Sequence, residues 1–459
     1  MKSVSRLQPQ PRSLARFGIG MKLLVITNLY PPLHAGTFDV RCETVVNRLV
    51  ERGHEALVLT SSYGMKEGQR SAGVERRLRL NGVFGQNLVT ARGELQAMEA
   101  HNHTVLRELI QRWKPELVYV WSLHGIGKSI LTSLSDANCA LVFDIADHWL
   151  DTGLRHDPWL RFWNSERVSI TDTVVRCGLE LSGQRNRIDR EAPTRLRAGV
   201  DRLPEVFDRD ASGSAETARV VQGIPPGSVC FCSHSVRAAA EAAGFAIKDA
   251  VVIHPGVRTD YFTGEVKPSG NRKCRLVLAA ELTRECGALT ALDALDLARQ
   301  QGSECVLTIV GRGSSDYISQ LRSKVIAAKL PVEFASVPDL SRDLLPVFRE
   351  HDIFLHTSEW DEPYISVALQ AMACGLPVIA STAGAASDVF SHGETALTYS
   401  AGSAEELAGC ILRMERDTQI RAVLAEAGRL SVAAQFDESG VIDRIEKFLR
   451  AASLMETKV

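Results

Sequence analysis

The chain has 459 residues, of which 45% are hydrophobic and 24% charged, and its formal net charge is −2. This length suggests two or three domains, and the composition is that of an ordinary soluble globular protein. The small net charge gives no general attraction to nucleic acid, and no apolar run approaches the ~18 residues of a membrane span. The ten cysteines show no metal-ligand spacing, so we expect reduced thiols in the cytosol and no metal centre.

The first element expected from the sequence is a buried strand over residues 21–27. The basic segment 1–20 before it lacks the apolar stretch of a secretory signal, so we expect a disordered extension or a misplaced start. A loop with two prolines follows the strand, then a helix over about 39–52 and a strand over 56–59. Gly36 in this loop is either a plain loop glycine or one that lets the backbone approach a phosphate closely.

Two further apolar runs, 115–121 and 141–145, predict parallel strands. His124 follows the first run, and Asp147 and His148 follow the second. Functional sites collect at the carboxyl ends of parallel strands. Both histidines are therefore candidates for catalysis, and a structural hydrogen-bonding role is the alternative for each.

The middle of the chain is the least regular part. Residues 151–228 are rich in Arg and Asp and predict no particular element. Strands are expected at 229–232 and 250–253, with a helix between them over 236–243. A turn after the second strand leads into a linker between domains, which we place at about 255–270.

The second half of the chain begins with two apolar strands, expected over 275–280 and 306–310. Each runs into a short polar loop at the carboxyl edge of the predicted sheet. Arg284 lies in the first of these loops, and the second opens with a G-x-G turn around Arg312, which alone is weak evidence of phosphate binding.

Residues 352–388 predict a strand, a loop, a helix and a second strand, which together form a right-handed βαβ unit. We expect the backbone N–H groups of Tyr364, Ile365 and Ser366 to begin the helix without intrahelical partners, an arrangement that suits a phosphate. Glu362 precedes them and is predicted to accept hydrogen bonds from the hydroxyls of a ribose or a sugar.

The phrase EPYISVALQAMACGLPVIAS in this stretch resembles the donor-binding segment of the retaining GT-B glycosyltransferases of family 4, the group 1 transferases. That family carries two glutamates spaced E-x7-E, and the second binds the ribose of the nucleotide. Glu362 falls on the first, whereas Gln370 falls on the second and keeps an acceptor oxygen without the charge. The resemblance covers roughly 21–60, 115–150 and 230–435.

The resemblance implies an α/β protein of GT-B fold, with two Rossmann-like doubly wound domains that face a cleft. The expected parts are a disordered extension, an N-terminal acceptor-binding domain, a C-terminal donor-binding domain, and a helix and tail that cross back to the first domain, at 1–20, 21–255, 270–435 and 436–459.

The implied function is sugar transfer from a nucleotide-sugar donor to a glycan, lipid-linked or small-molecule acceptor, with retention at the anomeric carbon. No metal or other cofactor is implied, and no nucleic acid partner. A cytoplasmic location is expected, with room for peripheral association at the inner face of the membrane.

The resemblance also assigns the site residues. The catalytic candidates are Glu362, His148, His124 and Asp147. The donor-binding candidates are Gly36, Arg284, Gly311, Arg312, Glu362, Tyr364, Ile365, Ser366 and Gln370.

The largest departure from the family lies at the donor diphosphate, where the family's Arg and Lys fall on Glu281 and Cys286. Arg284 or Arg312 could supply a replacement charge, and a solvated surface role is the alternative for Arg284. Two interpretations stay open. The protein is an active glycosyltransferase, or it is a catalytically degenerate GT-B protein that binds a nucleotide, a glycan or a partner subunit.

Overall fold

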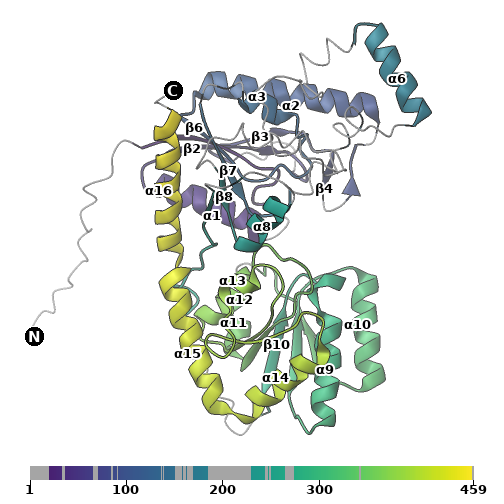
Figure 1. Cartoon of the computed structure of the whole chain (residues 1–459), viewed down its shortest axis with the longest axis vertical. Coiled ribbons are helices and arrows are strands. Elements are labelled where there is room, and N and C mark those ends of the chain that lie inside the picture. Colours follow the sequence, from purple (N-terminus) through teal and green to yellow (C-terminus); the bar gives the residue numbers. More distant parts are fainter. Residues whose placement is uncertain are drawn as a thin grey trace, which may run out of the picture.

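The computed structural model describes residues 20–33, 37–65, 71–83, 86–89, 91–135, 139–149, 169–184, 229–242, 250–263, 273–340 and 343–456, and the single residues 137, 158, 162 and 247. Gly36, residues 1–19, most of 151–228 and the second half of the expected linker lie outside the described residues. The described residues form two α/β domains, each built on one parallel sheet (Figure 1). The last strand of the first sheet ends at Val252, and the second sheet begins at Arg275. The domain boundaries expected from the sequence stay a prediction.

The N-terminal domain has a seven-stranded sheet in the described part of the chain, in the order β3-β2-β1-β6-β7-β8-β9. Its strands are β1 (Lys22–Ile26), β2 (Glu55–Ser61), β3 (Val74–Leu78), β6 (Leu117–Val120), β7 (Ala140–Ile145), β8 (Val229–Phe231) and β9 (Val251–Val252). Its helices are α1 (Thr37–Glu51), α2 (Arg92–Trp113), α3 (Ile130–Ser135), α6 (Ile170–Leu181) and α8 (His234–Ala242), and a small hairpin joins β4 (Gly82–Val83) to β5 (Gln86–Asn87).

The central strands of this sheet are continuous apolar runs because helices cover both of its faces. In β1, Leu24 and Ile26 pack into the cluster that contains α2 and α3. Leu23 and Val25 point the other way, into the cluster that contains α1. The alternation along a single strand therefore divides the core of this domain into two layers.

The C-terminal domain has six parallel strands in the order β12-β11-β10-β13-β14-β15. They are β10 (Arg275–Ala279), β11 (Val306–Val310), β12 (Val332–Ala335), β13 (Ile353–His356), β14 (Val378–Ser381) and β15 (Leu397–Tyr399). The helical segments are η3 (Arg284–Cys286), α9 (Ala288–Gln300), α10 (Ser315–Ala328), α11 (Leu345–Arg349), α12 (Ser366–Ala373), α13 (Ala386–Val389), α14 (Ala404–Arg416) and α15 (Thr418–Gln435). Numbered within the domain, the strand order is 3-2-1-4-5-6, that of a Rossmann fold.

The βαβ unit expected at 352–388 is present as β13, α12 and β14. Gly375 ends its helix with φ of 75°, a left-handed conformation that favours glycine, and its N–H donates to the Met372 carbonyl at 2.9 Å. The strand order places β10 beside β13, so the loops that follow these two strands meet at one edge of the sheet.

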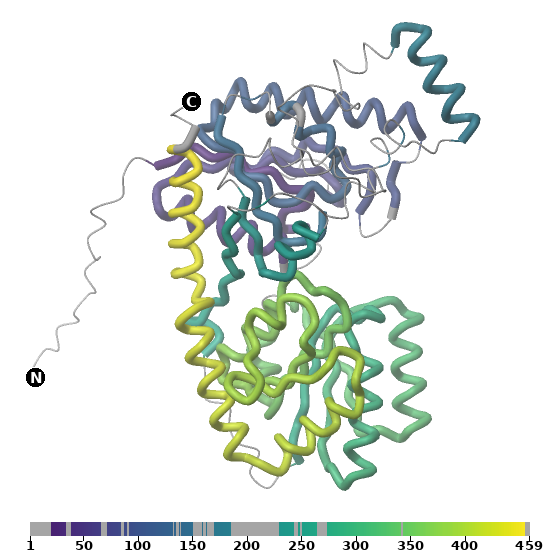
Figure 2. The backbone as a smooth tube through the Cα atoms, in the orientation of Figure 1, coloured from purple at the N-terminus to yellow at the C-terminus, as the bar shows by residue number. Residues whose placement is uncertain are grey.

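The last helix, α16 (Glu438–Glu456), leaves the C-terminal domain and runs along the N-terminal one (Figure 2). Its apolar face packs on β1 and α1 through Val441, Ile442 and Ile445. On its polar side Glu438 pairs with Arg48 at 2.8 Å. The crossing expected from the fold class is confirmed, and it ties the two domains together at their hinge side.

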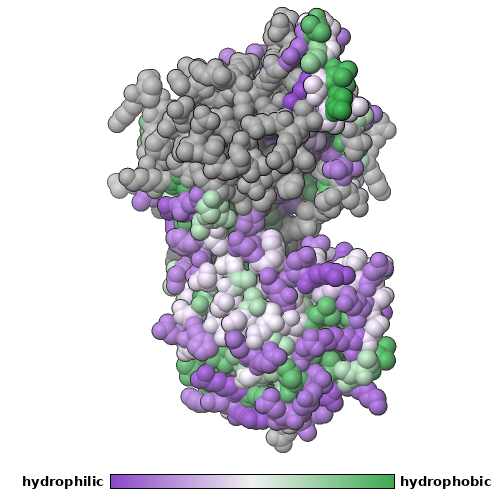
Figure 3. Space-filling view, turned by 45° about the vertical axis from the view of Figure 1, so that its right-hand side comes forward, coloured by the Kyte–Doolittle hydropathy of each residue, from purple (hydrophilic) through white to green (hydrophobic). Residues whose placement is uncertain are grey.

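Helix α6 lies at the edge of the N-terminal domain and contacts α2, where Asp172 pairs with Arg92 and Leu179 packs against Leu95 and Met98. None of its residues is buried, and Ile170, Val174 and Leu181 form an exposed apolar stripe, visible at the top of Figure 3. In the part of the chain that the structure describes, no helix is both long enough and apolar enough to cross a membrane.

Candidate active site

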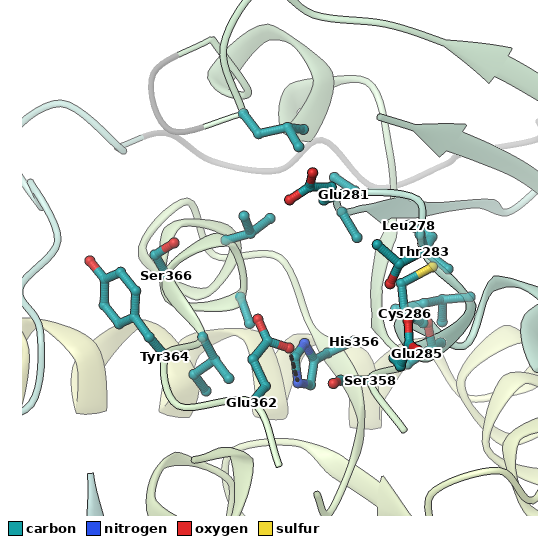
Figure 4. A pocket seen from close by; sticks show the side chains of 18 of the residues that line it. Leu278, Glu281, Thr283, Glu285, Cys286, His356, Ser358, Glu362, Tyr364 and Ser366 are labelled. Atoms are coloured by element: carbon teal, nitrogen blue, oxygen red, sulfur yellow. Dashed lines mark hydrogen bonds and ion pairs between the residues drawn. The ribbon is translucent and has the colours of Figure 1, made fainter. Parts of the chain in front are cut away.

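A cavity of about 710 Å³ opens at the carboxyl edge of the C-terminal sheet. It lies between β10 and β13, where the strand order reverses, which is the place where doubly wound sheets bind their ligands. Its walls come from the loop after β10, the end of β13 and the start of α12 (Figure 4).

The N-terminus of α12 contributes to this cavity. The helix begins at Ser366, later than expected, because Ile365 is still non-helical with φ −104° and ψ 47°. The amides of Val367 and Ala368 therefore lack intrahelical acceptors as well as that of Ser366, so these N–H groups extend beyond the expected residues 364–366. All of these residues, together with Tyr364, line the cavity. The positive end of the helix dipole and its free N–H groups make this wall suitable for an anion.

Glu362 stands in the loop before α12, with its carboxylate in the cavity (Figure 4). Its side chain is 29% exposed. Burial raises the pKa of Glu362 to about 7, although a hydrogen bond from Ser358 opposes the shift. Gly384 fixes the loop from behind: a Cβ there would collide with the Glu362 backbone, and the neighbouring Ala385 N–H donates to the Glu362 carbonyl at 2.9 Å. Near neutral pH this carboxyl is thus divided between its two protonation states.

His356 ends β13 and lies beside Glu362, with 3.9 Å between Nε2 and the carboxylate Oε2. Burial lowers the pKa of His356 to about 4, so its ring is neutral at physiological pH. The sequence analysis did not name it. The signal that could have found it is a titratable residue in the last position of a buried strand next to the switch point.

The charges of the cavity are mostly negative. Glu281, Glu285, Asp339 and Glu362 line it, and Arg312 is the one arginine or lysine among its described lining residues. Burial raises the pKa of Glu281, as expected for a carboxylate without a cation beside it.

Of the two arginines considered as replacements for the missing cations, Arg312 lines the cavity and Arg284 does not. Arg312 donates to the Val337 carbonyl at 3.4 Å and is otherwise exposed, and Arg284 lies exposed in η3. Gly311 serves packing, because a Cβ there would collide with the Ala280 carbonyl oxygen.

Cys286 holds its loop to the sheet and supplies no charge. Its carbonyl accepts a hydrogen bond of 2.6 Å from the Thr357 hydroxyl at the end of β13. Burial raises the pKa of the Cys286 thiol, so it is neutral. Glu281 and Cys286, the residues that the resemblance aligns with the family's two cations, therefore bring no positive charge to the cavity.

The N-terminal domain touches the Glu362 loop on both sides of the glutamate. His148 Nε2 lies 3.0 Å from the Asp361 carbonyl oxygen, and the Cys232 thiol donates to the Pro363 carbonyl at 3.0 Å. A third contact between the domains holds Asp388, whose carboxylate lies 3.0 Å from His254 Nε2. These contacts set the position of the loop relative to the first domain.

The other two catalytic candidates form a pair. His124 Nε2 lies 3.3 Å from an oxygen of Asp147, and the second oxygen accepts the Trp149 N–H at 2.8 Å. His124 is half exposed. Neither residue lines the cavity around Glu362, and nor does His148. The structure thus places these three on the side of the first domain and Glu362 on the other.

A buried charge cluster that the sequence analysis missed lies behind the site. Arg41 of α1 binds both oxygens of Asp144 at 3.1 and 3.3 Å, and Tyr119 donates to the same carboxylate at 2.7 Å. Burial opposes the charge of Arg41, but Asp144 and Tyr119 raise its pKa above the usual value. Arg41 lines a second cavity, of about 590 Å³, and Gln370 lines this one and not the cavity around Glu362.

Comparison with known proteins relates part of the sequence to a family and the fold to solved structures. Residues 265–431 match the family model of glycosyl transferases group 1. The amylovoran biosynthesis glycosyltransferase AmsK of Erwinia amylovora is 28% identical over 197 residues, 41% of this chain and 47% of that protein. The phosphatidyl-myo-inositol mannosyltransferase of Mycobacterium leprae is 28% identical over 215 residues, 46% of this chain and 56% of that protein. The chain spans about half the length of these curated relatives.

Solved structures resemble the whole chain. Anabaena Alr3699/HepE in complex with UDP and glucose has a TM-score of 0.60 at 20% identity, with 94% of this chain and 100% of that chain covered. Sucrose-phosphate synthase from Thermosynechococcus elongatus has a TM-score of 0.65 at 16% identity, with 94% and 98% covered. The two domains therefore have the GT-B fold. Within this fold, the segment 265–431, which contains the cavity around Glu362, is the part of the chain that matches the group 1 glycosyltransferases.

Proposed function

We propose that the protein transfers a sugar from a nucleotide-sugar donor to a glycan, lipid-linked or small-molecule acceptor, with retention of the anomeric configuration. The observation that carries the proposal is the cavity at the switch point of the segment that matches group 1, where Glu362 and the N-terminus of α12 face the same space. The resemblance to the HepE structure that holds UDP and glucose supports a nucleotide sugar as the donor.

In this proposal the donor diphosphate lies against the free amides of α12, and Arg312 approaches it from the next loop. The transferred sugar lies beside Glu362, whose carboxylate accepts hydroxyl hydrogen bonds. Charge that develops on the leaving diphosphate is stabilised by the helix N-terminus, so the proposal assigns no metal or other cofactor.

The acceptor binds on the side of the first domain, where His124 and Asp147 form their pair and His148 contacts the Glu362 loop. Closing the two domains brings donor and acceptor together and keeps water away from the reacting carbon. The contact of His148 with the Asp361 carbonyl makes the position of Glu362 depend on this closure.

The test compares the protein with its Glu362→Gln variant. Donor candidates with different bases and sugars are screened by calorimetry, and release of the nucleoside diphosphate is measured with an acceptor panel. We expect the variant to lose at least about 100-fold in kcat/KM, because a hydrogen bond to a charged group is lost in a low-dielectric site. The exposed Glu394→Gln variant is the control. Equal turnover of both variants would remove Glu362 from the reaction.

A second function, binding of a nucleotide or glycan without catalysis, is favoured by one observation. Four carboxyl side chains and one arginine line the cavity, which disfavours a diphosphate. In the same screen this function predicts nucleotide-sugar affinity without turnover for every acceptor tested.

We also propose a cytoplasmic protein that associates with the inner face of the membrane. The exposed apolar stripe of α6 supports this location. Sedimentation with anionic phospholipid vesicles tests it: the native protein should pellet, and a variant with Ile170→Ser and Val174→Ser should stay in the supernatant. Equal sedimentation of the two would exclude α6 as the contact.

A further inference from the structure

His356 carries a buried nitrogen for which the described residues provide no hydrogen-bond partner. The residue is 8% exposed, and its Nε2 atom is fully enclosed. Buried polar atoms without a partner are rare in folded proteins, because they lose their bonds to water and gain none in return. His356 also lines the cavity around Glu362, so a bound molecule can reach the region of this nitrogen.

The distance to Glu362 defines what would satisfy this nitrogen. The separation of 3.9 Å between Nε2 and Oε2 is too long for a direct hydrogen bond. One oxygen atom at a hydrogen-bond distance of about 2.8 Å from both would bridge this separation. Figure 4 shows the two side chains next to each other on one wall, with Glu281 across the cavity.

The chemical character of the two groups selects the oxygen. A neutral imidazole with its proton on Nε2 donates one hydrogen bond, and an ionised carboxylate only accepts. When Glu362 is ionised, the atom between them must therefore accept from one side and donate to the other. A hydroxyl does both, whereas a phosphate oxygen or a carbonyl only accepts. A phosphate or carbonyl oxygen would place a second acceptor next to the ionised carboxylate, with no hydrogen to share between them.

We propose that His356 and Glu362 hold one hydroxyl of the transferred sugar between them, and that His356 thereby determines which donor sugars the protein accepts. The hydroxyl donates to the Glu362 carboxylate and accepts from the His356 Nε2–H. This assignment rests on the proposed function, since it requires that the cavity receives the sugar of a nucleotide sugar. It adds to Glu362 a second contact, from a different element of the sheet.

The arrangement has a consequence for specificity. A sugar without the hydroxyl, or with the opposite configuration at that carbon, leaves both buried groups unpaired at once. Sites built to hydrogen-bond a hydroxyl discriminate strongly against analogues that lack it for this reason. Discrimination should therefore be concentrated at one carbon of the sugar and should be much weaker at the others.

The experiment combines removal of single hydroxyls from the donor sugar with substitution of His356. Binding of the donor and of its monodeoxy analogues is measured by calorimetry for the native protein and for His356→Leu, with turnover measured in parallel. For one deoxy position we expect the native protein to lose about 10- to 100-fold in affinity. In His356→Leu the native donor should bind as weakly as that analogue, with no further loss on removing the hydroxyl. The nucleoside diphosphate alone should bind both proteins equally.

Two controls separate a contact with sugar from a structural role. His356→Gln keeps an N–H donor and should recover part of the lost affinity. Thermal unfolding of His356→Leu should occur at the native temperature or above it, because an unpartnered buried polar atom has been removed. The exposed His392→Asn variant should behave as the native protein in every measurement.

The outcomes distinguish the inference from the function on which it rests. Suppose that the protein binds and transfers a sugar, but removing each hydroxyl lowers the donor affinity of His356→Leu by the same factor as that of the native protein. The shared hydroxyl contact of His356 and Glu362 is then wrong, and the proposed function stands. If no nucleotide sugar binds more tightly than its nucleoside diphosphate, the sugar is not in this cavity. The hydroxyl contact and the proposed function are then both wrong. A marked drop in thermal stability of His356→Leu, with donor affinity unchanged, would show a structural histidine instead.

Discussion

The strongest quantitative prediction concerns the protonation of Glu362. Burial raises the pKa of its carboxyl from 4.5 to about 7 in the folded protein. The unfolded chain keeps the ordinary value, so between these two pH values the folded state holds a proton that the unfolded state has released. A pKa difference of this size corresponds to about 3 kcal/mol.

The sign follows from proton linkage. Because the folded state binds more protons in this window, stability falls as the pH rises from about 4.5 to about 7 and is level above it. Glu362→Gln removes the titration. The variant should therefore gain stability relative to the native protein as the pH rises, by up to about 3 kcal/mol at pH 8 relative to the difference at pH 4.

The assay is urea denaturation of both proteins across this pH range, together with NMR of ¹³C-labelled glutamate, in which the signal missing from the variant reports Glu362 directly. The same titration should appear in kcat/KM, which should rise with a midpoint near pH 7 if the ionised carboxylate accepts the sugar hydroxyl. A stability difference that is constant from pH 4 to pH 8, with a glutamate signal titrating near 4.5, would refute the reasoning.

Three further predictions concern charge. Arg41→Ala leaves the Asp144 carboxylate buried without its cation, with only the Tyr119 hydroxyl still donating to it, so it should cost about 3–5 kcal/mol in urea denaturation, and a loss below 1 kcal/mol would contradict the buried pair. Glu281→Arg restores a cation to the cavity and should tighten nucleoside diphosphate binding at least about tenfold by calorimetry; unchanged affinity would mean that the diphosphate lies elsewhere. Arg312→Gln should weaken nucleoside diphosphate binding about tenfold, whereas Arg284→Gln should leave it unchanged. A loss of affinity in Arg284→Gln alone would show that Arg284, and not Arg312, contacts the diphosphate.

Much of the C-terminal domain could be predicted from local sequence. The apolar runs at 306–310 and 353–355 are strands, and Gly375 ends the helix between β13 and β14 in the expected conformation. These features depend on residues close to one another in the chain, namely on burial of consecutive apolar side chains and on the freedom of glycine. The placement of Glu362 before a helix N-terminus belongs to the same class, since the two are four residues apart.

The composition of the site could not be predicted in the same way. Arg284 and Arg312 were both candidates for the missing charge, and only the arrangement of the loops after β10 and β11 puts Arg312 in the cavity and Arg284 outside it. Gln370 was assigned to the donor site by resemblance, but the rotation of α12 turns it to the second cavity. Arg41 and Asp144 were not among the predicted site residues, and they are 103 positions apart in the chain.

The sequence by itself therefore determined the central strands of both sheets and the segment that holds the candidate site, and the family resemblance indicated the fold class. Tertiary structure alone decided which charges meet in the cavity, that His356 lies 3.9 Å from Glu362, and that the first domain touches the Glu362 loop through His148. The physical reason is the distance along the chain over which the interactions act. Helices, strands and turns follow from interactions within a few residues, whereas the burial, the pKa and the partners of a polar side chain depend on which strands become neighbours in the sheet.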